Sequence, residues 1–152
     1  MSDQLLIRRA ASSDLAAIAL IRAQTRELHV GKSDAHMPPE ELRSFINDPY
    51  GIFLVAMFGE TLAGFAYASG PDPVRQPHTK AARLVYLTII PEWRKRGFAG
   101  QLMHAVEDEL KRRGVIGLYA WAASEAGGEA VSFCHHRLFA LGNRFVYVEK
   151  KL

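Results

Sequence analysis

The stretch PEWRKRGFAG (residues 91–100) sets three cationic side chains directly before small residues at the start of a long amphipathic segment. A strand-forming apolar run ends just before it at Ile90. The first four N–H groups of a helix have no partner within it and carry partial positive charge. Glycine lets a ligand approach the backbone, and basic side chains add attraction for phosphate. The stretch therefore predicts strand, turn and helix, with either an anion cradle or a solvated basic turn between them.

Length and composition predict an ordinary globular protein. The 152 residues predict one domain over 1–152, and 49% hydrophobic with 23% charged residues is typical of a globular chain. No apolar run approaches the roughly 20 residues that cross a bilayer. We expect no signal peptide, because the N-terminus lacks a basic region followed by an apolar stretch. The single cysteine, Cys134, excludes an internal disulfide and fits the cytoplasm.

The charge pattern favours a small anionic ligand over nucleic acid. The formal net charge is only +3. A nucleic-acid interface would use residues 94–96 and 111–113, but no aromatic residues alternate with these cations as stacking platforms. No metal site is expected either, since His135 and His136 are adjacent and point in different directions on a helix.

The hydrophobic periodicity predicts a mixed α/β (α+β) fold with a mostly antiparallel central sheet flanked by helices, in the order β-α-α-β-β-β-α-β-α-β. The predicted strands are 5–7, Ile52–Phe58, Thr61–Ser69, 82–90, 115–122 and 144–150. The predicted helices follow Ser12-Ser13-Asp14 and span 39–47, 98–113 and 129–141. Gly114 predicts a left-handed cap at the end of the third helix.

The pattern L-x-I-x-P-x-x-R-x-x-G-x-A over residues 87–99 resembles the acetyl-CoA signature of the GNAT superfamily of N-acetyltransferases. Arg94, Gly97 and Ala99 match the family's [QR]-x-x-G-x-[GA]. The resemblance covers nearly the whole chain, from the opening IRRAASSDLAAI through the hairpin with Gly64 to the closing helix, glycine and aromatic strand. It implies a GNAT-like fold, acetyl-CoA as co-substrate, and direct transfer of the acetyl group to a primary amine of a small molecule or peptide.

The resemblance also assigns a binding role to individual residues. The backbone of one strand would pair with the pantetheine arm, and a loop would give N–H groups to the pyrophosphate, with the strands parting at Pro91. The residues assigned to coenzyme A are Leu87, Thr88, Ile89, Arg94, Lys95, Arg96, Gly97, Phe98, Ala99 and Gly100.

Two positions depart from the family's catalytic pattern. Tyr86 stands where many relatives carry the glutamate that serves as base, and Cys134 stands where the usual acid is a tyrosine. Tyr86 is interpreted either as a substrate-facing residue or as packing, and Cys134 either as a catalytic thiol or as a small buried hydrophobe. His135 and His136 are further candidates for moving a proton.

In this family the acceptor amine usually lies between the loop that joins the first two helices and the later strand ends. The residues this suggests are His29, Asp34, His36, Glu40, Glu41, Glu125 and 72–78. A catalytically silent acyl-CoA-binding module is the alternative function, because the usual acid and base are replaced. A homodimer through an aromatic edge with Phe145 and Tyr147 is a further expectation.

Overall fold

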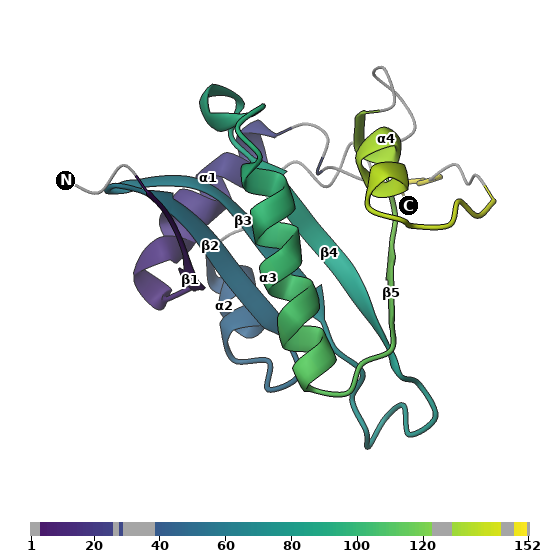
Figure 1. Cartoon of the computed structure of the whole chain (residues 1–152). Helices are drawn as coiled ribbons and strands as arrows, with labels where there is room; N and C mark the ends of the chain where they lie inside the picture. Colours follow the sequence, from purple (N-terminus) through teal and green to yellow (C-terminus); the bar gives the residue numbers. More distant parts are fainter. Residues whose placement is uncertain (1–3, 26–27, 29–38, 123–128, 144–147, 152) are drawn as a thin grey trace.

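The computed structural model describes residues 4–25, 28, 39–122, 129–143 and 148–151. Their elements in chain order are β1 (Leu5–Arg9), the 3-10 turn η1 (Ser12–Asp14), α1 (Leu15–Gln24), α2 (Pro39–Ile46), β2 (Ile52–Phe58), β3 (Thr61–Ser69), β4 (Ala81–Ile89), the 3-10 turn η4 (Pro91–Trp93), α3 (Phe98–Arg112), β5 (Gly117–Ala120) and α4 (Glu129–His136). The strands form one sheet in the order β1-β2-β3-β4-β5. Helices α1 and α2 cover one face of this sheet and α3 covers the other (Figure 1).

The sheet is antiparallel from β1 to β4, and β5 runs parallel to β4. Strand β2 is apolar on both faces because each face has its own core. Leu54 packs in the core that holds Met103 and Val106 of α3. Val55 packs in the other core, with Ile18 of α1 and Leu42 of α2. The predicted fold class, a mixed and mostly antiparallel sheet flanked by helices, is confirmed.

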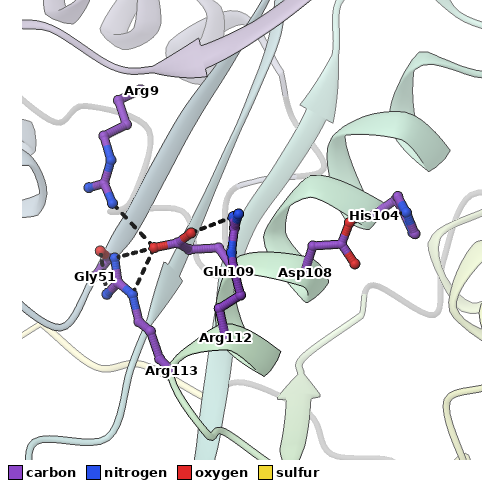
Figure 2. A network of polar contacts seen from close by, with 7 residues as sticks. All are labelled: Arg9, Gly51, His104, Asp108, Glu109, Arg112 and Arg113. Atoms are coloured by element: carbon purple, nitrogen blue, oxygen red, sulfur yellow. Dashed lines mark hydrogen bonds and ion pairs between the residues drawn. The ribbon is translucent and has the colours of Figure 1, made fainter.

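A cluster of charged side chains fastens α3 to the start of the sheet (Figure 2). Glu109 accepts hydrogen bonds from Arg112 at 2.6 Å and from Arg113 at 3.0 Å on its own helix. It also accepts one at 3.4 Å from Arg9, the last residue of β1. Arg113 donates in turn to the carbonyl oxygen of Gly51, just before β2, at 3.4 Å. Glu109 and Arg113 together thus join the end of α3 to two segments that are distant in sequence.

The last helix is shorter than the sequence predicted. It ends at His136, whereas the prediction extended it to Leu141. Leu138 adopts a left-handed backbone with φ of 67°, and the Phe139 N–H donates to the Cys134 carbonyl at 3.0 Å. This closure is the Schellman type, whose left-handed residue is normally glycine. The prediction was wrong because it placed the helix end next to a glycine.

The end of the chain is described only in part. Residues 144–147 of the predicted last strand lie outside the described residues, and 148–150 are not in a strand. The strand predicted over 115–122 is confirmed in its central part, as β5. Among the residues described, no helix combines the length and apolarity needed to cross a membrane.

Candidate acyl-CoA site

Strands β4 and β5 separate partway along β4. Strand β5 pairs only with the first four residues of β4, ending at Leu84. The next residue, Val85, has no partner in β3, because Ala68 pairs with Leu84 and the adjacent Tyr67 pairs with Tyr86. A β-bulge of this kind bends its strand. The separation therefore begins at Val85, and the expectation that it occurs at Pro91 is wrong.

Beyond the bulge, the outer edge of β4 has no strand partner among the described residues. The Ile90 N–H donates to the Ala63 carbonyl of β3 at 2.9 Å. Backbone groups of an antiparallel strand point alternately toward and away from the partner. Thr88 therefore directs its N–H and carbonyl toward β3, while Leu87 and Ile89 direct theirs toward the open edge. Of the three strand residues predicted to pair with a pantetheine arm, two have backbone groups that face this edge.

The loop before α3 is shaped by two left-handed residues, Lys95 with φ of 61° and Gly97 with φ of 77°. Gly97 is the N-cap of α3, and the first bond of the helix runs from Gln101 N–H to the Gly97 carbonyl at 3.1 Å. The N–H groups of residues 98–100 precede that bond, so they have no acceptor within the helix.

The surroundings of these N–H groups suit an anion. A Cβ built on Gly97 or Gly100 would meet no atom within 4 Å, so the backbone is open to a ligand at both positions. Arg94, Lys95 and Arg96 are exposed, and the first turn of α3 contains no acidic residue. Three cations at the positive end of a helix dipole repel it, and a bound anion relieves that repulsion. The donors and the open space fit the diphosphate of coenzyme A.

Arg94 connects the two parts of this site. Its Nε donates to the Ile89 carbonyl, at the end of β4, at 2.8 Å. This bond holds the loop against the open strand edge, and the role of Arg94 at the start of a pyrophosphate loop stays a prediction.

Tyr86 lies in the core between the sheet and the first two helices, with 8% of its surface exposed. Its hydroxyl accepts a hydrogen bond at 3.1 Å from Nε of Arg22, whose own exposure is 1%. Arg22 was not among the residues predicted from the sequence. The helical spacing could have identified it, because Arg22 follows Leu15 by seven residues and Ile18 by four, which puts a cation on the buried face of α1.

Cys134 is half-buried on α4, and burial raises the pKa of its thiol. A thiol that stays protonated at neutral pH is a poor nucleophile. Cys134 and Trp121 line a cavity of about 780 Å³ between β5, α4 and residues 138–143. His135 and His136 are exposed, and Nδ1 of His136 donates to the Ser132 carbonyl within α4 at 2.8 Å.

Those of the predicted acceptor residues that the structure describes are not brought together. Glu40 and Glu41 are exposed at the start of α2. The loop over 72–78 leads to Lys80, whose carbonyl accepts the Ile116 N–H beyond the C-terminus of α3. It therefore lies at the opposite end of the sheet from the loop before α3 (Figure 1). His29, Asp34, His36, Glu125, Phe145 and Tyr147 lie outside the described residues.

The described residues contain no group of three or more His, Cys, Asp or Glu side chains arranged to hold a metal ion.

A sheet that opens beside β4, followed by a basic helix start, is the arrangement that the resemblance to acetyl-CoA-dependent N-acetyltransferases led us to expect. The sequence matches the acetyltransferase (GNAT) family over residues 17–138. The chain belongs to this family, as the motif over 87–99 indicated. No curated protein sequence matches it.

Solved structures with the same fold include three acetyltransferases. An aminoglycoside acetyltransferase, meta-AAC0020, from an uncultured soil metagenomic sample in complex with sisomicin is 18% identical, with a TM-score of 0.74 over 97% of this chain and 96% of that one. AAC(6')-Iy in complex with the bisubstrate analog CoA-S-monomethyl-acetylneamine is 20% identical, with a TM-score of 0.69 over 98% and 99%. A GNAT-family acetyltransferase from Streptococcus pneumoniae is 20% identical, with a TM-score of 0.75 over 98% and 94%.

Proposed function

We propose that the protein transfers an acetyl group from acetyl-CoA to a primary amine of a small molecule or peptide by direct attack. One observation carries the proposal: the open edge of β4 and the anion-binding start of α3 are consecutive in the chain and joined by Arg94. A single extended ligand with a diphosphate at one end and a thioester at the other fits such a pair of sites.

The chain's own groups supply binding and orientation in this reaction. The N–H groups of residues 98–100 and the cations of the loop would hold the diphosphate. The outward-facing N–H of Leu87 would donate to the thioester oxygen, which gains negative charge as the amine nitrogen bonds to the carbonyl carbon. The C–S bond then breaks, and the sulfur leaves with its electron pair and takes up a proton.

The amine must lose a proton before or during attack, and we propose that water accepts it. Tyr86 is buried and held by Arg22, and the pKa of the Cys134 thiol is raised by burial. With no protein base, kcat/KM should rise with pH along the titration of the amine itself. A plateau at a pH well below the pKa of the amine would instead indicate a base in the protein.

The structural neighbours support a small amine as acceptor. Two of them are complexes, one with sisomicin and the other with the bisubstrate analog CoA-S-monomethyl-acetylneamine. Release of free thiol from acetyl-CoA should therefore be tested with aminoglycosides, polyamines, amino acids and peptide N-termini. Thiol release above the hydrolysis control with one of these classes is the expected result. Acetyl-CoA binding without turnover of any amine would favour the silent module.

The cytoplasm remains the proposed location, because acetyl-CoA is an intracellular donor and the sequence has a single cysteine. A homodimer also remains a proposal. Exposed Tyr119, Trp121 and Leu138 near β5 and α4 support it, since aromatic side chains are enriched at interfaces.

A further inference from the structure

Beside the anion site, the loop carries a stacked pair of side chains. The guanidinium carbon of Arg96 lies 4.7 Å from the centre of the Trp93 ring. The ring of Trp93 packs against Phe58 with centres 4.6 Å apart, and is stacked with Phe98 at 6.2 Å and an interplanar angle of 19°. Trp93 also packs against the buried core under α3. The indole is therefore a fixed platform, and Arg96 is the cation that lies over it.

The backbone is bent so that this stacking can occur. Arg96 lies between Lys95 and Gly97, which both have left-handed φ values. Lys95 is one of two described residues other than glycine with positive φ. Such a conformation is unfavourable for a lysine and is commonly kept where function requires it. It brings Arg96 back over a ring three residues earlier in the chain.

We propose that Trp93 is a positioning residue for the acyl donor: it holds the planar guanidinium of Arg96 at the start of α3 so that Arg96 binds a phosphate group of coenzyme A. The proposal rests on the proposed function. Lysine and arginine cations both attract an aromatic face, but an arginine lies on it more often than a lysine, because the guanidinium is flat and weakly hydrated. The same flat group can present parallel N–H donors to a phosphate. Arg96 and Trp93 should therefore act as one unit.

A double-mutant cycle tests this coupling. Dissociation constants for coenzyme A are measured by calorimetry for wild type, Trp93→Leu, Arg96→Gln and the double variant. We expect each single change to weaken binding about tenfold, and the double variant to bind no more than about twofold worse than the weaker single variant. Multiplication of the two single effects, to about a hundredfold, would overturn the proposal. So would unchanged affinity in a folded Trp93→Leu protein.

A second readout separates positioning from a merely structural role. Loss of a phosphate contact reduces the dependence of log Kd on log salt concentration, so this slope should fall equally in Trp93→Leu and Arg96→Gln. An unchanged slope in Trp93→Leu would contradict the proposal. Lys111→Gln, at an exposed cation near the far end of α3, is the matched control. If Trp93→Leu fails to fold, Trp93→Phe keeps a smaller ring and should show an intermediate loss.

A comparison of coenzyme A with dephospho-CoA shows which phosphate group of coenzyme A Arg96 binds. An Arg96→Gln effect that persists with dephospho-CoA assigns Arg96 to the diphosphate, and one that disappears assigns it to the 3′-phosphate. Wild type that binds neither compound would contradict the proposed function itself. Equal affinity of wild type and Arg96→Gln for coenzyme A would contradict only the role of Arg96.

Discussion

The Nε of Arg22 on α1 donates a hydrogen bond at 3.1 Å to the hydroxyl of Tyr86 on β4, and both side chains are buried. Tyr86→Phe removes the acceptor and leaves a buried charged donor with one partner fewer. We expect the free energy of unfolding to fall by about 1–3 kcal/mol. Denaturant titration measures this change. Tyr119→Phe, at an exposed tyrosine, should stay within about 0.5 kcal/mol.

The same variant tests whether Tyr86 takes part in catalysis. If Tyr86 only packs and pairs with Arg22, kcat should change less than about fivefold. A loss of a hundredfold or more in kcat with unchanged binding of acetyl-CoA would assign Tyr86 to the reaction.

Two glycines should respond in opposite ways to alanine. A Cβ on Gly64 would lie 2.3 Å from the Thr88 carbonyl oxygen, so Gly64→Ala should push β3 from β4 and cost about 1–3 kcal/mol. A Cβ on Gly100 meets no atom within 4 Å, and alanine favours the helix, so Gly100→Ala should gain up to about 1 kcal/mol. Thermal melting measures both, and a destabilised Gly100→Ala would contradict the open geometry.

Replacing Leu138 by glycine should stabilise the protein. Leu138 holds a left-handed backbone at the end of α4 while 93% of its surface is exposed. Leu138→Gly removes the steric penalty of that backbone, which is about 1–2 kcal/mol, and exchanges little packing. We expect a gain of about 1 kcal/mol by denaturant titration. Ser132→Gly, inside the same helix, should instead lose about 1 kcal/mol, and the same sign for both variants would refute this account.

Acidification should weaken the cluster around Glu109. Burial alone raises the pKa of Glu109, but the hydrogen bond from Arg113 and the positive charges of Arg112, Arg113 and Arg9 outweigh it, so the pKa is lowered. A carboxyl whose folded pKa is lowered stabilises the fold above its unfolded pKa of about 4.3, and that stability is lost as pH falls through the folded pKa. Between pH 7 and pH 3, wild type should lose more stability than Glu109→Gln.

Asp14 should contribute in the same direction. Hydrogen bonds from Arg8 at 2.7 and 2.9 Å lower the pKa of Asp14, although burial raises it.

Glu60→Gln, at the exposed turn between β2 and β3, is the control for Glu109→Gln, and its stability should fall with acid as that of wild type does. A Glu109→Gln protein whose stability falls with acid as steeply as that of wild type would show that the cluster makes no net contribution.

The sequence predicted features that depend on local chemistry. Gly114 was expected to cap α3 in a left-handed conformation, and its φ is 76°, with the Val115 N–H donating to the Leu110 carbonyl. The hairpin strands β2 and β3 begin and end where the alternation between apolar runs and turn residues placed them. In each case the deciding residue type is adjacent to the feature it controls.

Features that depend on tertiary packing were not predictable in this way. Helix α4 ends at His136, and the chain closes it with a left-handed Leu138 at a position that favours glycine, next to Phe139, which packs against the core. The bulge at Val85 lies where β4 pairs with β3 on one side and loses β5 on the other, and the local sequence pattern of β4 does not indicate either pairing. The stacking of Arg96 on Trp93 similarly requires the left-handed Lys95.

The most direct test of the central claim is a calorimetric titration of acetyl-CoA into wild type and Gly100→Glu. Gly100 is the better position for a blocking charge, because Gly97 needs a positive φ whereas Gly100 is an ordinary helical residue facing open space. We predict saturable binding by wild type, with Kd between about 1 μM and 1 mM, and at least tenfold weaker binding by a Gly100→Glu protein that melts no lower than wild type. Absence of binding by folded wild type, or equal affinity in the two proteins, would contradict an acyl-CoA site at the start of α3.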